Sequence, residues 1–247
     1  MQGIMHIKQQ INCINVWYKI YKTNIYNMNE FEFSTLSADL RTLAVKIPLR
    51  WGTVQNNRID DNINMFAILS YTELEKQISR LSDEKKNYFR RRWYLWKCSE
   101  CDEYLFYKNE NVVKNPDRYD KAWDVRIDGK YDFDIKGTVI PREMRGDVDK
   151  VLENPLSMVN FFYDKQSTGR RYNIQNRLFI VHHSFIDPER EFYLRCAWQS
   201  KEKIYKQFCD NVDSIQFIST HKVIAGVIFI LERQKGDIDY RISGLNQ

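Results

Sequence analysis

The sequence has no hydrophobic run long enough to cross a membrane. Its longest apolar stretch, Val223 to Leu231, has nine residues, whereas a membrane-spanning helix needs about 18 to 20. The first residues are also unlike a secretory signal, because Lys, Gln and Asn interrupt their apolar residues throughout. We therefore expect a protein without a membrane segment.

Cysteines are few. The chain has five, an odd number at wide spacing, which is unlike the disulfide framework of a secreted protein. We therefore expect a reducing, cytoplasmic location. Cys98 and Cys101 form one CxxC pair, but a structural zinc site would need a second pair or two suitably spaced histidines. A zinc-stabilised interaction domain is an alternative that rests on this single pair.

Several enzyme classes are disfavoured by motifs that the chain lacks. It contains no glycine-rich phosphate-binding loop, no serine nucleophile elbow and no HExxH motif. Its net charge is only +5, which permits a local nucleic-acid-binding patch without requiring one. Hydrophobic residues make up 43% of its 247 residues, enough for one large folded domain or two small ones.

The most informative stretch that is present runs from Trp123 to Thr138. It reads as two short strands joined by a tight turn at Asp128-Gly129, with apolar residues alternating on both sides. Because strand side chains alternate between faces, Asp134 and Lys136 share a face, together with Asp132. The apolar residues of the strand then face the other way, into the core.

The geometry of the turn decides whether Asp124 joins this polar face. A two-residue turn would put Asp124 opposite Phe133, on the wrong face. A type I turn followed by a left-handed Gly129 makes a one-residue bulge. That turn would pair Arg126 with Lys130 and Asp124 with Asp132, and we predict this bulged form.

This arrangement resembles the PD-(D/E)xK nuclease superfamily, whose members include many restriction enzymes. The Asp134-Ile135-Lys136 segment matches the (D/E)-x-K triplet on the third strand of a meander, and Asp124 matches the acid on the strand before it. A literal Pro-Asp occurs at Pro116-Asp117, but we prefer Asp124 because the hairpin carries it next to Asp134. The resemblance covers about residues 82 to 232. It depends on the placement of the triplet on an extended strand after a hairpin.

The resemblance implies a metal-dependent nuclease that hydrolyses phosphodiester bonds in DNA. Asp124 and Asp134 would hold Mg²⁺ (or Mn²⁺), with the Ile135 carbonyl as a further ligand, and Lys136 would position or activate the attacking water. The helix before the meander often supplies another acid, for which Glu100 and Glu103 are both candidates.

The resemblance also bears on partners. Three arginines that come after the Asp134-Ile135-Lys136 triplet in the sequence are candidates for contacting the phosphates of DNA: Arg142, Arg170 and Arg171. Restriction-like enzymes often dimerise to cut both strands of DNA, so a homodimer is possible. A role in restriction or defence would be an analogy from the fold alone. The main alternative is a non-catalytic module of the same fold that binds nucleic acid or protein.

The rest of the chain predicts an α/β protein with a mixed central sheet flanked by helices. We divide it into a partly helical extension, residues 1–81, and a restriction-endonuclease-like domain, residues 82–247. Residues 1–27 contain no acid and receive no function. Within the second domain we expect the following elements: a helix capped by Ser82 and running through Trp96, a first meander strand at Tyr104–Tyr107, a helix starting at Asn154-Pro155, a buried strand at Leu178–Val181, and a central strand at Val223–Leu231.

Overall fold

The computed structural model of the chain describes residues 28–47, 57–60, 63–117, 120, 122–166 and 175–245. Residues 1–27 and the arginines 170 and 171 therefore lie outside the described residues.

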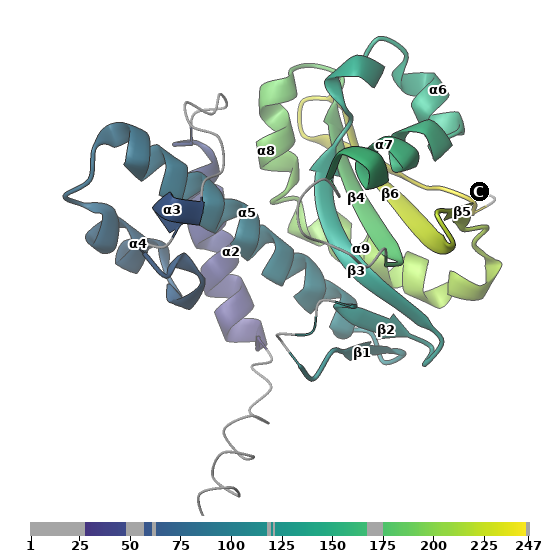
Figure 1. The fold of residues 1–247 in the computed structure, drawn as a ribbon, viewed down its shortest axis with the longest axis horizontal. Helices are drawn as coiled ribbons and strands as arrows, with labels where there is room; N and C mark the ends of the chain where they lie inside the picture. The colour runs from purple at the N-terminus through teal and green to yellow at the C-terminus, as the bar shows by residue number, and fades with distance from the viewer. Residues whose placement is uncertain are drawn as a thin grey trace, which may run out of the picture.

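A layer of helices packs beside a twisted sheet (Figure 1). The helical elements are α2 (Glu30–Ala44), α3 (Asn57–Asp60), η1 (Met65–Ala67), α4 (Tyr71–Ile78), α5 (Asp83–Tyr107), η2 (Arg142–Met144), α6 (Val148–Glu153), α7 (Leu156–Gln166), η3 (Pro188–Arg190), α8 (Glu191–Leu194), α9 (Trp198–Asp210) and η4 (Val212–Ser214).

The strands are β1 (Val112–Lys114), β2 (Val125–Ile127), β3 (Tyr131–Val139), β4 (Arg177–Ser184), β5 (Ile218–Thr220), β6 (Val223–Gln234) and β7 (Asp237–Ile242). They form one sheet in the order β1-β2-β3-β4-β6-β5, and β7 also pairs with β6. The β1-β2-β3 meander is antiparallel, whereas β3, β4 and β6 run parallel to one another. The expected mixed sheet flanked by helices is confirmed, with β6 inside the sheet.

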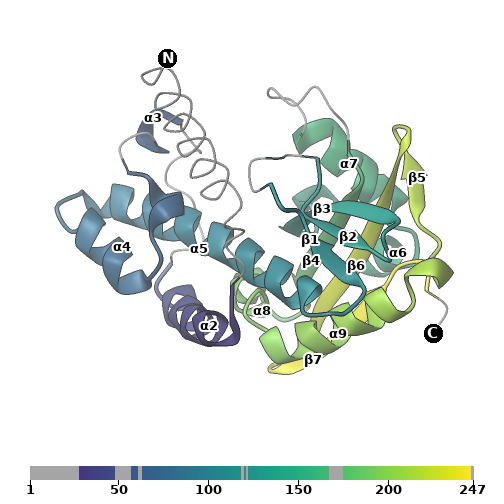
Figure 2. The same cartoon turned by 90° about the horizontal axis from the view of Figure 1, so that it is seen from below.

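Helices cover the two faces of the sheet, as Figure 2 shows. Phe133 and Ile135 belong to a buried cluster that contains residues of α5 and α9. Phe179 and Val227 belong to a second cluster, which they share with residues of α7. By strand alternation, the polar residues of β3 project to the side opposite Phe133, the side of α7.

Helix α5 is the long element on which much of the fold packs. It has 25 residues, and neither glycine nor proline interrupts it. The predicted strand at Tyr104–Tyr107 is wrong, because this segment is the last turn of α5. Trp93, Cys101 and Leu105 lie on the buried face at helical spacing, so the apolar run continues that face.

Local capping also differs from the prediction in one place and agrees in another. Ser82 is the N-cap of α5, but its side chain makes no capping hydrogen bond. By contrast, α7 begins after Asn154-Pro155 as expected, and the Asn154 side chain accepts a hydrogen bond from the Leu156 backbone N–H at 3.2 Å.

The segment before α5 packs on the same core as the sheet. Leu36, Leu40 and Leu43 of α2 are buried in the cluster that also contains Phe133 and Ile135. The division of the chain at residue 81 stays a prediction. Within the described ranges, no helix has the length and apolar character required to cross a membrane.

The hairpin between β2 and β3 has a register that differs from the prediction. Ile127 pairs with Tyr131 and Arg126 with Asp132, so the predicted pairing of Arg126 with Lys130 is wrong. Asp128 and Gly129 both have positive φ, at 53° and 66°. Asp128 tolerates this conformation while its backbone N–H donates to the Asn111 carbonyl at 2.8 Å.

Candidate functional site

The β2–β3 hairpin brings Asp124, Asp134 and Lys136 together, as the sequence predicted. An Asp124 carboxylate oxygen accepts a hydrogen bond from the Ile135 backbone N–H at 2.7 Å. The Lys136 ammonium donates to Asp134 Oδ1 and lies 3.3 Å from the Ile135 carbonyl oxygen. Although the register differs from the predicted one by two residues, the strand period is also two, so the same side chains share a face.

A polar loop places Asp124 at this position. Asn115 is buried, and its backbone N–H donates to the Asp124 carbonyl at 2.9 Å. The Asn115 side-chain amide also donates to the Trp123 carbonyl at 2.8 Å. Asp117, the acid of the literal Pro-Asp, is exposed in the same loop. The hairpin thus brings Asp124 to the strand that carries Asp134, and its role as the second metal-binding acid stays a prediction.

Burial makes the Asp124 carboxylate costly to ionise. Desolvation is the largest influence and raises its pKa to about 6; the nearby Asp134 carboxylate adds to the rise, and Lys136 opposes it. A carboxylate poised near neutral pH beside a second acid is typical of functional sites. Ionised Asp124 therefore favours a nearby positive charge.

Glu103 on α5 is electrostatically coupled to this site. Burial raises the pKa of Glu103 to about 8, and the Asp124 carboxylate is the next largest cause. Glu100 has other partners: its carboxylate accepts hydrogen bonds from Trp96 at 2.8 Å and Lys97 at 2.7 Å. Of the two candidates, Glu103 is thus the one whose pKa is influenced by Asp124, and the contribution of either acid to the site stays a prediction.

Arg177 is a site residue that the sequence did not reveal. It opens β4 directly beside Asp134 in the sheet register, and its Nε lies 3.5 Å from Asp134 Oδ2. The guanidinium stacks on the Tyr163 ring at 4.9 Å. Among the described residues, its buried Nε and Nη1 have no hydrogen-bond partner. No local motif marks this arginine, because strand pairing alone brings it to Asp134.

The predicted phosphate-binding arginines are only partly placed. Arg142 is exposed in η2, after β3. The neighbouring Arg145 is instead engaged inside the fold, where it donates to the Ile140 carbonyl at 3.1 Å and to Glu191 at 2.6 Å. The contacts of Arg142 with DNA stay a prediction, as do those of residues 170 and 171.

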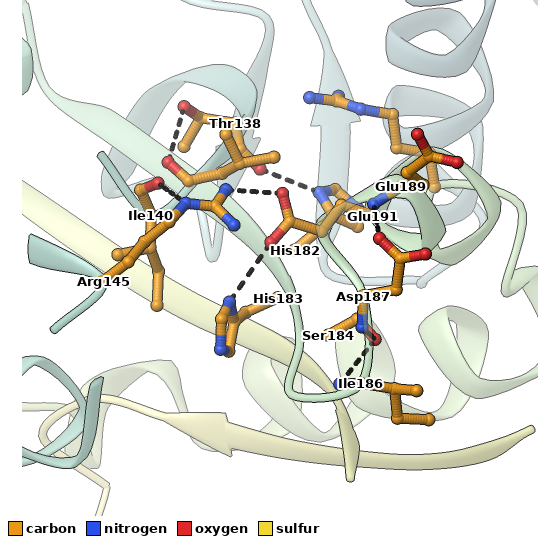
Figure 3. Close-up of polar contacts among 12 residues, drawn as sticks. Thr138, Ile140, Arg145, His182, His183, Ser184, Ile186, Asp187, Glu189 and Glu191 are labelled. Carbon is orange, nitrogen blue, oxygen red and sulfur yellow. Dashed lines mark hydrogen bonds and ion pairs between the residues drawn. The ribbon is translucent and has the colours of Figure 1, made fainter. Parts of the chain in front are cut away.

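Both histidines of β4 contact groups of the protein itself, as Figure 3 shows. His183 Nδ1 lies 3.2 Å from Glu191, the same carboxylate that binds Arg145. His182 Nδ1 lies 3.1 Å from the Thr138 carbonyl oxygen, and burial lowers the pKa of His182 well below its ordinary value. The two rings occupy opposite faces of the sheet, as expected from strand alternation.

The hairpin can be tested for its fit to a magnesium ion. Asp124 and Asp134 supply carboxylates, and Mg²⁺ typically takes one or two of these while keeping several waters. The Lys136 ammonium already contacts Asp134 Oδ1 and the Ile135 carbonyl oxygen. These two oxygens therefore lie close enough together to surround one positive charge. The donor set therefore fits Mg²⁺, although in the described part of the chain no three His, Cys, Asp or Glu side chains group as metal ligands.

The CxxC pair is a poorer candidate for metal binding than the hairpin carboxylates. Cys98 and Cys101 are buried within α5, and burial raises the pKa of both thiols. Zinc binds the thiolate form, so these surroundings disfavour it. The pair is better explained as part of the packed core.

Comparisons of the chain with protein-family models, with curated proteins and with solved structures find no match.

Proposed function

We propose that the chain is a metal-dependent nuclease that hydrolyses phosphodiester bonds in DNA, with a restriction-endonuclease-like core. The observation that carries this proposal is the convergence of Asp124, Asp134 and Lys136 on one hairpin. Two acids and an ammonium, in a partly buried setting that raises the pKa of Asp124, meet the demands of this reaction. A role in restriction or defence is an analogy from the fold.

Each residue has a role in this proposal. Asp124 and Asp134 would hold Mg²⁺ (or Mn²⁺), together with the Ile135 carbonyl. When bound, the metal supplies a polarised phosphoryl oxygen and a more acidic water. Lys136 holds positive charge beside Asp134 and would orient the attacking water or offset charge on the phosphate. Arg142 and the arginines 170 and 171 would contact the DNA backbone.

Glu103 and Arg177 extend the proposal to residues outside the motif. Protonated Glu103 can donate a hydrogen bond near Asp124, and its ionised form adds negative charge that a metal would neutralise. Arg177 is held by the Tyr163 ring beside Asp134 and can fix the orientation of that carboxylate. Both residues act through the acids, so we regard them as positioning residues.

A binding module of the same fold is the second candidate. The observation in its favour is that Lys136 already compensates the charge of Asp134 within the protein. A domain that only binds DNA or protein can use such an internal ion pair for structure, with no need of a metal.

A cleavage assay separates the two candidates. Plasmid, linear duplex and single-stranded DNA are incubated with Mg²⁺, Mn²⁺ or EDTA, using wild type, Asp134→Asn and Lys136→Met. Asp132→Asn is a matched control, because Asp132 lies on the same strand but pairs with Arg126. We expect metal-dependent cutting that both site variants lose and the control keeps. Cutting that survives Asp134→Asn would refute the assignment of the site, and DNA binding without cutting by wild type would support the module.

A further inference from the structure

Two buried cysteines from distant parts of the chain meet on one side of α5. Cys98 lies in the middle of that helix, whereas Cys196 lies between α8 and α9. A hydrogen bond joins the two thiols, and both are free of disulfide bonds. We call these two residues the Cys98–Cys196 pair. Direct contact between two sulfurs is the first requirement for a disulfide, because one sulfur must attack the other.

Tyr94 and the backbone around Cys196 set the position of this contact. Tyr94 and Cys98 are four residues apart in α5, so they share one face of the helix. Tyr94 Oη lies 3.3 Å from Cys196 Sγ and donates to the Phe192 carbonyl at 2.5 Å. The Cys196 backbone N–H donates to the Tyr193 carbonyl at 2.8 Å. Both the side chain and the backbone of Cys196 are therefore held by named partners.

The two thiols of the pair differ in acidity. The hydrogen bond with Cys98 lowers the pKa of Cys196, and the Lys201 ammonium adds to the lowering, while burial opposes it. This ammonium is held nearby, 3.0 Å from the carbonyl oxygen of Arg195, the residue before Cys196. Burial instead raises the pKa of Cys98 well above its ordinary value. Because the thiolate is the nucleophilic form, Cys196 is the more reactive of the two.

Cys196 is also the least buried cysteine in the described part of the chain. Its exposed fraction is 7%, whereas no other described cysteine exceeds 1%. A thiol with more thiolate character and more access to solvent, next to a second thiol, is typical of cysteines that oxidise reversibly. In the Cys98–Cys196 pair, Cys196 would be attacked by the oxidant and Cys98 would complete the disulfide.

The other two described cysteines are less suited to this chemistry. Cys101 lies one turn from Cys98 in α5, and burial raises its pKa well above the ordinary value, with Asp102 adding to the rise. Cys209 lies in α9, where burial raises its pKa to about 12. Neither has the thiolate character that favours oxidation.

We propose that the Cys98–Cys196 pair is a site of reversible oxidation, at which hydrogen peroxide converts the two thiols into a disulfide. The Cys196 thiolate attacks one peroxide oxygen, so that an S–O bond forms, the O–O bond breaks and hydroxide leaves. The Cys98 sulfur then attacks the Cys196 sulfur, so that the S–S bond forms, the S–O bond breaks and water leaves. The two thiols lose two electrons and two protons, and one hydrogen peroxide becomes two waters.

The resulting disulfide would link α5 to the segment that leads into α9. A dithiol reductant attacks the same bond and restores both thiols, so the link is reversible. The proposal does not depend on nuclease activity, because neither cysteine belongs to the hairpin that carries Asp124, Asp134 and Lys136.

The test is oxidation of the full chain with a small excess of hydrogen peroxide in EDTA. Free thiols are then alkylated, the chain is digested without reductant, and the linked peptides are identified by mass spectrometry. We expect a predominant Cys98–Cys196 link that dithiothreitol removes. The same oxidation in concentrated urea is the reference, because unfolding removes the contact. There the Cys98–Cys101 link should predominate, since an unfolded chain closes short loops most readily.

Three variants assign the two roles. Cys98→Ser keeps a hydrogen-bond donor beside Cys196 and should stop the reaction at the Cys196 sulfenic acid, which dimedone traps. Cys196→Ser should leave Cys98 as a thiol. Cys101→Ser is the matched control, because it alters a buried cysteine one turn along the same helix, and it should form the link as wild type does.

Wild-type peptide mapping requires no variant to fold, so it decides the proposal by itself. The proposal is overturned if the folded wild type keeps both thiols of the pair, or if Cys98 pairs with Cys101 instead. It is also overturned if Cys98→Ser yields no trapped sulfenic acid at Cys196, or if Cys101→Ser loses the link while its circular dichroism matches that of wild type.

Discussion

Replacing Glu103 by glutamine should stabilise the protein at alkaline pH. In the folded chain the pKa of Glu103 is raised from 4.5 to about 8 by burial and by Asp124. Folded Glu103 therefore keeps its proton between these values, whereas the unfolded chain has lost it. Because the folded state binds more protons in this window, stability falls as pH rises from 4.5 to 8. Glutamine is neutral at every pH and removes this loss.

The magnitude follows from the size of the pKa change. A difference between 4.5 and about 8 corresponds to about 5 kcal/mol, at about 1.4 kcal/mol for each pH unit. Glu103 keeps partial contact with solvent, which screens its charge. We therefore expect Glu103→Gln to raise the free energy of unfolding by about 2 to 4 kcal/mol at pH 8.5, and to change it little at pH 4.5.

Urea unfolding followed by tryptophan fluorescence measures this difference, in EDTA at pH 4.5, 6.5 and 8.5. Glu100→Gln is the control, because Glu100 is bonded to Trp96 and Lys97 and its removal should not stabilise the chain at high pH. If the advantage of Glu103→Gln fails to grow between pH 4.5 and pH 8.5, the raised pKa of Glu103 in the folded chain is refuted.

Three other predictions concern the core and the site. Lys201→Met should cost about 3 to 5 kcal/mol in urea unfolding, because it leaves Asp102 buried without its cation; adding Asp102→Asn should recover part of the loss. If the hairpin is a nuclease site, Mg²⁺ affinity in calorimetry should fall about tenfold per pH unit below pH 6, as Asp124 takes up its proton; an affinity that does not change between pH 5 and pH 7 would contradict this. Arg177→Lys keeps the charge but loses stacking on Tyr163, so kcat should fall about 10- to 100-fold with KM little changed; a change in KM alone would count against positioning.

The face shared by the site residues could be predicted because it depends only on the period of a strand. Asp134 and Lys136 are two residues apart, so they share a face whatever the register. The register itself was predicted wrongly, because it depends on a contact between Asp128 and Asn111 that lies outside the hairpin. An error of two residues in the pairing left Asp124 on the correct face.

Other features could not be predicted from local patterns. The apolar run at Tyr104–Tyr107 fits a short strand as well as the end of a helix, and the structure shows the helix because the run extends the buried face of α5. Arg177 reaches Asp134 through the pairing of β4 with β3. The influence of Asp124 on the pKa of Glu103 depends on how α5 packs beside the hairpin. The family resemblance offered Glu103 only as one of two candidates, and the spacing of residues along the chain carries no signal for the pairing of Arg177 with Asp134.

The position of Lys136 provides a way to separate metal binding from catalysis. Its ammonium contacts Asp134 Oδ1 and the Ile135 carbonyl, two of the oxygens proposed as metal ligands, so the lysine and a cation compete for the same atoms. Lys136→Met removes the competitor, and we expect tighter Mg²⁺ binding in calorimetry together with loss of DNA cleavage. In a binding module, the same substitution would leave Asp134, which is only 5% exposed, without this partner, and the chain would lose stability without gaining metal affinity. Mg²⁺ affinity that rises while cleavage falls would therefore favour the enzyme, and a loss of stability with no change in Mg²⁺ affinity would favour the module.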